Sequence, residues 1–392
     1  MASDDHDPEY RPATRAIHPI SLASRDFESL ATPIYRGSTV LFDKLADVVD
    51  RRRNPEHYRY GLTGTPTARE LALRIAALEG AHRSWLVPGG LAAISATYLA
   101  TCKAGSHVLL PASAYPPNRE LGDGLLSRFG IEVEQYDPLI GAGIAALIRP
   151  DTALIWCESP GSITMEIQDV PSIAAAAKPR GVPVALDNTY AAGVLFDAFA
   201  AGVDISLQAL TKYVGGHSDM LLGSISVREP AMARTFGTTL EQLGMGVSPD
   251  DCALALRGLA TLNIRLAALE QSTLEVAHWL KQRPEVKNML HPAFPDCPGH
   301  EHWKRDFTGS ASLFSIIFRD WSAAQVERFV DSLRLFKIGY SWGGVVSLVM
   351  AYPHLVRPTP EHGPRLVRLN IGLEHPADLI GDLEQAIMKA NS

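Results

Sequence analysis

The sequence predicts an α/β protein in which a large, mostly parallel sheet covered by helices is followed by a smaller α+β domain. First, short apolar runs alternate with helical stretches between residues 63 and 258. Second, the pattern changes after residue 259, where one long helical segment leads into a mixed region. Third, 392 residues that are 46% hydrophobic and 20% charged are typical of a globular protein with two substantial cores.

The chain divides into three zones. Residues 1–62, rich in Arg, Pro and Asp, are expected to form an N-terminal arm that lies against something else. Residues 63–258 are expected to form the large domain, with strands at 84–87, 107–110, 132–136, 153–157, 182–186, 205–210 and 224–227. Residues 259–392 are expected to form the C-terminal domain, with helices over 261–281, 323–335 and from Pro376 onward, and strands near 312–318, 345–350 and 365–371.

Composition argues against several classes of partner. A formal net charge of −7 gives no basic surface for nucleic acid. No apolar run approaches the ~20 residues of a membrane span, and the first residues lack an apolar signal core. The four cysteines lie far apart without a C-x-x-C pair, which favours reduced, buried thiols. We therefore expect a cytoplasmic protein that binds neither nucleic acid nor membranes.

Two charged residues follow neighbouring predicted strands. Asp187 ends the run at 182–186, and Lys212 follows the next run 25 positions later. Ligands of parallel sheets bind at the carboxyl ends of the strands, so both side chains are expected to face one cleft. A lysine amine can hold an aldehyde cofactor covalently, and a carboxylate keeps a pyridine nitrogen protonated. The pair predicts a pyridoxal phosphate site, although each residue alone is more often a surface lysine or a helix N-cap.

The phosphate of such a cofactor needs its own donors. Gly89 and Gly90 lie between a predicted strand and an Ala-rich helix, so the first amides of that helix, including that of Leu91, could bind a dianion. Tyr115 follows another strand and could stack on a flat ring or belong to the core.

Two further motifs indicate other chemistry. Cys297, His300 and His302 resemble a metal-ligand cluster, but they give at most three ligands on one Pro/Gly-rich loop, so we expect no metal. The run GYSWG matches the nucleophile elbow of serine hydrolases, with Ser341 as nucleophile. An apolar, strand-like run follows this motif where an elbow requires a helix. Its conceivable triad partners are Glu361, His362, Glu374 and His375.

Several longer motifs carry a resemblance to a known family. LTKYVGGHSDMLLGS, LDNTYAAGVLF, CESPGSITMEI, HEHWKRDFTGSASLFS and SWGGVVSL are similar to motifs of the Cys/Met-metabolism group of pyridoxal phosphate enzymes. The resemblance covers the chain from Thr14 to Ile387. It implies fold type I, the aspartate-aminotransferase-like architecture, assembled as a homotetramer of two catalytic dimers.

The resemblance also implies roles for individual residues. Lys212, Tyr115 and Tyr60 are implied as catalytic residues, with Lys212 as the covalent cofactor lysine and general base. The implied cofactor-binding set is Lys212, Asp187, Tyr115, Gly90, Leu91, Thr211 and Tyr60, and the implied substrate-binding set is Arg368, Ser341, Trp342 and Tyr340.

Within the family, a few positions resemble the β-lyase branch. Tyr340 and Trp342 flank Ser341 where γ-lyases and γ-synthases have glutamate and leucine, and Ser162 and Ala209 also follow the β-lyase pattern. The implied reaction is α,β-elimination of a sulfur amino acid, with L-cystathionine giving L-homocysteine, pyruvate and ammonia. A γ-lyase or γ-synthase, or a general cysteine-S-conjugate β-lyase, is the alternative.

One position departs from the family pattern. Tyr60 matches a tyrosine that reaches the partner subunit's phosphate site, but Leu62 stands where the family has a phosphate-binding arginine. Either Arg59 or Arg36 replaces that arginine, or the phosphate is held with fewer donors.

Overall fold

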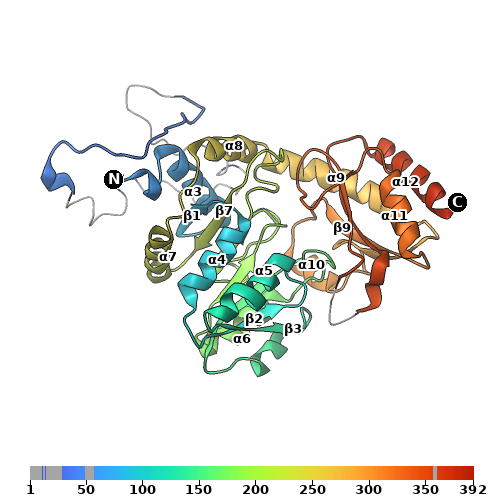
Figure 1. The fold of residues 1–392 in the computed structure, drawn as a ribbon, viewed down its shortest axis with the longest axis horizontal. Helices are drawn as coiled ribbons and strands as arrows, with labels where there is room; N and C mark the ends of the chain where they lie inside the picture. Colours follow the sequence, from blue (N-terminus) through green and yellow to red (C-terminus); the bar gives the residue numbers. More distant parts are fainter. Residues whose placement is uncertain (1–10, 12–13, 15–28, 49–56, 356–359) are drawn as a thin grey trace.

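The computed structural model describes residues 11, 14, 29–48, 57–355 and 360–392, except for the side chains of residues 360–362. These residues build two sheets with helices packed around them (Figure 1). The strands are β1 (Arg83–Val87), β2 (His107–Pro111), β3 (Glu132–Tyr136), β4 (Thr152–Glu158), β5 (Val184–Asp187), β6 (Ile205–Gln208), β7 (Gly223–Val227), β8 (Val286–Leu290), β9 (Leu313–Phe318), β10 (Lys337–Ile338), β11 (Leu348–Ala351) and β12 (Leu366–Asn370). The longer helices are α3 (Pro66–Glu79), α4 (Gly90–Thr101), α5 (Pro116–Leu121), α6 (Val170–Ala177), α7 (Pro230–Leu243), α8 (Pro249–Ala260), α9 (Leu262–Lys281), α10 (His300–Asp306), α11 (Ala323–Ser332) and α12 (Pro376–Asn391).

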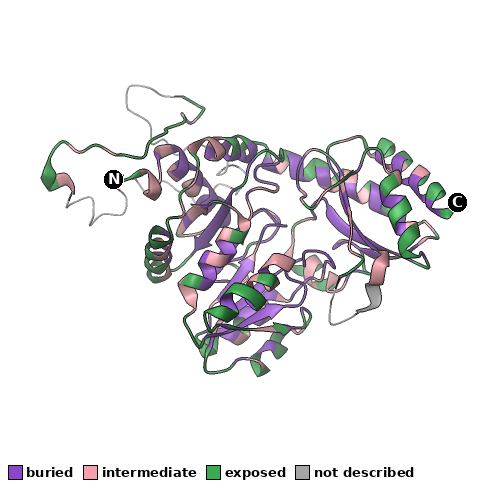
Figure 2. Ribbon diagram, viewed as in Figure 1, coloured by how far each residue is buried: buried purple, intermediate pink, exposed green. Residues whose placement is uncertain are grey.

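The large sheet has the order β1-β7-β6-β5-β4-β2-β3. Strand β7 runs antiparallel between β1 and β6, and the remaining pairs are parallel. All seven strands expected in residues 63–258 are present, so the prediction of a mostly parallel α/β sheet is confirmed. The central strands are buried along their length, which is why they appear in the sequence as continuous apolar runs (Figure 2).

Local signals fix where several helices begin. Thr65 caps α3 and accepts a hydrogen bond from the Ala68 amide, with Pro66 at the first helical position. Ser322 and Gln325 form a reciprocal capping box at the start of α11. At the other end of α3, Gly80 adopts φ 69°, a left-handed conformation that suits glycine.

The smaller sheet has the order β10-β11-β12-β9-β8 and is antiparallel except for the β10–β11 pair. The sequence pattern did not reveal β8 or β10. Helix α9 joins the two parts of the molecule, because its Leu262, Leu266 and Leu269 pack in the core of the large sheet while Val276 and Leu280 pack in the core of the small one. The predicted domain boundary after residue 258 lies in the last turn of α8.

Residues 29–48 of the arm lie outside both sheets and are mostly exposed (Figures 1 and 2). Two of its contacts with the body are the Arg36–Asp250 ion pair and the Thr67 hydroxyl, which accepts from the Tyr35 amide at 2.8 Å and donates to the Pro33 carbonyl at 2.7 Å. Among the described helices, none alone has the length and apolar character to cross a bilayer, although α8 and α9 together, bent by 61°, meet that test by length and composition.

Candidate active site

Asp187 and Lys212 come from adjacent strands of the large sheet. Asp187 is the last residue of β5, and Lys212 lies in the turn that follows β6. This turn is closed by main-chain hydrogen bonds from the Lys212 amide to the Ala209 carbonyl at 3.1 Å and from the Gly216 amide to the Lys212 carbonyl at 2.8 Å. The two charged side chains therefore lie at the carboxyl edge of the sheet, as the sequence predicted.

Thr189 orients the Asp187 carboxylate. Its amide donates to Asp187 Oδ1 at 3.0 Å and its hydroxyl donates to the same oxygen at 2.5 Å. The Thr189 hydroxyl also accepts the Ala209 amide at 2.8 Å, which ties the carboxylate to the Lys212 turn. Burial raises the pKa of Asp187, while the Thr189 hydrogen bonds and the Lys212 charge oppose that rise. A bound cation at the other oxygen would oppose this rise in pKa.

The Lys212 amine lies where the two halves of the molecule meet. Its Nζ donates to Ser341 Oγ at 2.8 Å and lies 5.3 Å from the centre of the Trp342 ring. Burial and, to a smaller extent, the Arg368 charge lower the pKa of Lys212 to about 8, against the opposing effect of Asp187. About half of this amine is therefore neutral near pH 8, and a neutral amine is what a nucleophile or general base requires.

Arg368 is a buried cation on β12. Its Nη1 donates to the Ser162 carbonyl at 3.2 Å and its Nη2 to the Tyr340 carbonyl at 2.6 Å, and its guanidinium lies 5.3 Å from the Tyr352 ring centre. Its exposed fraction is 5%, and within the part of the chain that the structure describes it forms no ion pair with a carboxylate. Burial lowers the pKa of Arg368. A buried guanidinium without a countercharge is suited to a carboxylate ligand.

Tyr115 is placed by the start of α5. Its amide donates to Glu158 Oε2 at 2.8 Å, and the residue is 40% exposed, so of the two alternatives for Tyr115 the core position is wrong. Burial raises the pKa of Tyr115, and the charges of Glu158 and Asp187 add to that rise. The phenol therefore stays protonated and can present its ring and hydroxyl to a ligand.

The start of α4 lies beside the Lys212 turn. Gly90 is the first helical residue, and a Cβ there would lie 2.7 Å from the Ala209 side chain. Glycine therefore allows the helix N-terminus to approach the Lys212 turn, and the amides of Gly90 and Leu91 have no acceptor within the helix. The Thr211 hydroxyl, by contrast, donates to the Leu222 carbonyl at 3.1 Å and accepts the Leu222 amide at 3.0 Å.

Ser341 lies in a loop between β10 and β11. The element that follows it is the strand β11 and not a helix, so the nucleophile-elbow alternative is wrong for this motif. Glu374 accepts the Ser347 amide and hydroxyl, and His375 caps α12. The side chains of Glu361 and His362 lie outside the described residues. Asn370 Oδ1 accepts the Gly343 amide at 3.0 Å and holds the loop in place, while the Tyr340 side chain is 77% exposed.

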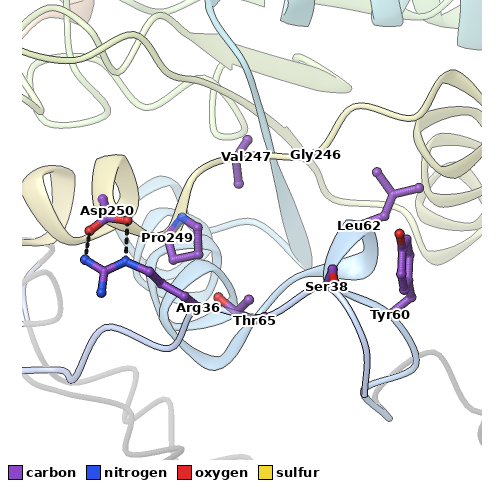
Figure 3. A pocket seen from close by; sticks show the side chains of 11 residues that line it. Arg36, Ser38, Tyr60, Leu62, Thr65, Gly246, Val247, Pro249 and Asp250 are labelled. Atoms are coloured by element: carbon purple, nitrogen blue, oxygen red, sulfur yellow. Dashed lines mark hydrogen bonds and ion pairs between the residues drawn. The ribbon is translucent and has the colours of Figure 1, made fainter. Parts of the chain in front are cut away.

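Tyr60 lies in a different cavity, of about 470 Å³, together with Ser38, Leu62 and Val247 (Figure 3). None of the other predicted site residues lines it. The two candidate substitutes for the missing arginine both form ion pairs. Arg36 pairs with Asp250 (Figure 3), and Arg59 Nη2 lies 3.1 Å from Glu241 Oε2.

The residues of the suspected metal motif point to separate partners. Cys297 Sγ donates to the Met165 carbonyl at 3.2 Å, and His300 Nδ1 lies 2.8 Å from the Pro292 carbonyl. His302 Nδ1 lies 3.9 Å from Asp169 Oδ2. These three side chains do not converge on one point.

The donor set fits pyridoxal phosphate: a partly buried amine, a carboxylate with one oxygen bound by Thr189, and a helix N-terminus that approaches Ala209 in the Lys212 turn. The sequence model of the family described as Cys/Met metabolism PLP-dependent enzyme matches residues 13–388. The chain belongs to this family. Its members depend on pyridoxal phosphate, so the cofactor prediction is confirmed.

Family members with solved structures share the fold. The crystal structure of metB from Corynebacterium glutamicum superposes with a TM-score of 0.89 at 29% identity and covers 97% of this chain and 98% of that one. The chain is 42% identical to the cystathionine β-lyase of Bordetella avium, over 91% of this chain and 92% of the relative. It is 40% identical to the cystathionine β-lyase MetC of Escherichia coli, over 90% and 91%. The fold type I prediction is confirmed.

Sequence reasoning missed the residues that hold the site in place. Arg265, on α9, donates to the carbonyls of Tyr213 at 2.7 Å, Val214 at 3.3 Å and Gly258 at 2.7 Å, which anchors the chain just after Lys212. Nothing near Arg265 in the sequence points to this contact. Thr189 could have been found, because a residue two positions after an aspartate is a common partner of its side chain.

The lowered pKa of Lys212 predicts how the apo protein captures its cofactor. Only the neutral amine attacks an aldehyde, so the capture rate should rise with pH and reach half its maximum near pH 8. An unshifted lysine would place this midpoint near 10.5. Stopped-flow absorbance of apo protein mixed with pyridoxal phosphate across this pH range measures it. A midpoint at or above pH 10 would contradict the lowered pKa.

Proposed function

We propose that this enzyme is a carbon–sulfur β-lyase that cleaves L-cystathionine to L-homocysteine, pyruvate and ammonia. One observation carries the proposal. Arg368 is buried without an ion pair to a described carboxylate, and it lies close to the Lys212 amine, whose pKa is lowered. This pair can bind an amino-acid carboxylate and move a proton at the neighbouring α-carbon. The names of the curated relatives with 40–42% identity support the choice of cystathionine.

The chemistry divides among these residues as follows. Pyridoxal phosphate, when bound, supplies an electron sink next to the α-carbon of the substrate. Arg368 binds the α-carboxylate through its two outer nitrogens, and the Tyr340 and Ser162 carbonyls hold the guanidinium in place. Lys212 takes the α-proton and later returns a proton to the departing sulfur. The negative charge of Asp187 would keep the pyridine nitrogen of the bound cofactor protonated.

The proposed cofactor ligands are Lys212 for the aldehyde, Asp187 for the ring nitrogen, Tyr115 for the ring face, and the amides of Gly90 and Leu91 for the phosphate. Thr211 joins them if its hydroxyl rotates away from Leu222. Ser341 and Trp342 form the wall beside the amine, since Ser341 Oγ accepts from Lys212 Nζ. Residue 340 next to this wall is a largely exposed tyrosine. It therefore adds no acidic group to the wall.

A product assay on L-cystathionine tests the proposal. We expect pyruvate and homocysteine in equal amounts, because the proton moved by Lys212 is followed by loss of the sulfur on the β-carbon. Lactate dehydrogenase coupling measures pyruvate, and thiol chromatography separates homocysteine from cysteine. Formation of 2-oxobutyrate and cysteine would instead identify a γ-lyase. Faster turnover of cystine or another S-conjugate would identify a general β-lyase.

We further propose that the catalytic unit is a dimer and that two such dimers form a homotetramer. Tyr60 is 53% exposed and lies in a cavity that contains no residue of the Lys212 site. A second copy related by two-fold symmetry could bring Tyr60 to the phosphate donors of its partner. Arg36 would serve there only by leaving Asp250, and Arg59 only by leaving Glu241.

Mixing two inactive variants tests the shared site. If Tyr60 of one subunit completes the site of the other, hybrids of Lys212→Ala and Tyr60→Ala subunits contain one intact site and regain part of the activity. Each variant refolded alone is the control. Hybrids that stay as inactive as the parents would place Tyr60 outside the shared site. Analytical ultracentrifugation of the wild type determines whether the assembly is a tetramer.

We place the enzyme in the cytoplasm, in a step that yields a methionine precursor. All four cysteines are free thiols, which suits a reducing compartment.

A further inference from the structure

A second cluster of polar side chains lies at the edge of the large sheet opposite to Asp187. His107, Glu132 and Thr152 are the first residues of β2, β3 and β4, and His107 pairs in register with both of the others. Residues paired in register on parallel strands present their side chains to the same face, and Glu134 lies on that face two residues along β3. Four side chains therefore meet at the amino ends of these strands, whereas Asp187 lies at the carboxyl end of β5.

His107 is the buried member of this cluster. Its side chain is fully buried, and its Nδ1 lies 2.9 Å from Thr152 Oγ1. The Thr152 oxygen also accepts the Arg149 amide at 2.8 Å. When Nδ1 carries the proton and donates to Thr152, the lone pair of Nε2 is free. Within the described structure, Nε2 forms no hydrogen bond and lies 3.3 Å from Glu134 Oε2.

These separations match a metal-binding geometry. Two ligands of a tetrahedral zinc ion with bonds of about 2.0–2.1 Å lie about 3.3–3.4 Å apart. The His107 Nε2 to Glu134 Oε2 distance has this value, and one ring nitrogen of His107 and one carboxylate oxygen from each glutamate all lie within 4.8 Å of one another. Thr152 is the kind of partner that fixes the tautomer and orientation of a metal-binding histidine.

Arg149 occupies the same carboxylates. Its Nη1 donates to Glu132 Oε1 at 2.8 Å and its Nη2 to Glu134. The Arg149 side chain is 41% exposed, so it can turn into solvent without leaving a buried charge behind. We propose that His107, Glu132 and Glu134 bind a divalent transition-metal ion of the zinc class in exchange for the Arg149 guanidinium. This site stands apart from the cofactor site, so it does not depend on the proposed reaction.

Titration of the holoenzyme with Zn²⁺ by calorimetry tests the site. We expect one strong equivalent per subunit that raises the midpoint of thermal unfolding. The exposed Glu132→Gln variant should weaken binding by about tenfold or more. Arg149→Ala should tighten binding, because the ion no longer displaces a cation.

Two controls separate this site from other zinc ligands. Arg128→Ala removes the same charge from an exposed position four residues before Glu132 in the sequence and should leave the affinity unchanged. His107→Gln should remove Zn²⁺ binding, and far-UV circular dichroism checks that this variant of a buried residue still folds. If His107→Gln does not fold, the exposed Glu132→Gln variant decides whether the site exists. A wild-type protein that binds no Zn²⁺, or an affinity that Glu132→Gln and Arg149→Ala leave unchanged, overturns the proposal.

Discussion

Replacing Lys212 by alanine should abolish turnover and remove the borohydride-reducible cofactor adduct. The lysine holds the cofactor, and it also moves a proton at the α-carbon. Loss of the general base alone costs about 10²–10⁴-fold in rate. The measurement combines the visible absorption of the purified protein, mass spectrometry after borohydride reduction, and kcat on L-cystathionine.

The matched control for this variant is Lys178→Ala, which removes an exposed lysine from the same domain. It should keep the adduct and normal turnover. A reduced adduct that persists in Lys212→Ala would show that another lysine carries the cofactor, and the assignment of Lys212 would be wrong. Non-covalent cofactor retained by Lys212→Ala is compatible with the assignment, because Asp187 and the α4 amides remain.

Replacing Arg368 by alanine should weaken substrate capture by about 2–5 kcal/mol, the usual cost of leaving a buried charge unpaired. This corresponds to a fall in kcat/KM of roughly 30- to 5,000-fold, mostly through KM. The physical reason is that no described carboxylate neutralises Arg368, so the substrate carboxylate is its natural partner. Steady-state kinetics on L-cystathionine measures the effect.

Two comparisons isolate the carboxylate contact. Arg365→Ala removes a neighbouring arginine whose Nη1 donates to the Arg319 carbonyl on the surface, and it should leave kcat/KM near the wild-type value. An amine analogue of the substrate without its α-carboxylate should bind equally weakly to the wild type and to Arg368→Ala. If Arg368→Ala lost the same affinity for that analogue as for the substrate, the arginine would have a structural role instead.

The sequence predicted the large sheet well because its strands are buried on both faces and follow one another as continuous apolar runs. Strand β8 was missed because its run, VKNML, mixes exposed and buried positions right after a long helix. Strand β10 has only two residues and both are exposed, so it carries no hydrophobic signal.

The candidate site was predictable where one side chain at a strand end carries the chemistry, as with Asp187 and Lys212. Partners that lie far away in the sequence were not predictable. The Arg36–Asp250 pair spans 214 positions, and the Arg265 contacts to Tyr213 span 52. The cluster around His107 was missed for the same reason, because β2, β3 and β4 meet only after the sheet has formed.

The hydrogen bond between Lys212 and Ser341 joins residues made at different times during synthesis. The cofactor lysine and its carboxylate partner leave the ribosome well before β12, which carries Arg368 close to the end of the chain. Domains generally fold in the order in which they are made. A nascent chain can therefore complete the half of the site that holds the cofactor before it contains the half that selects an amino acid.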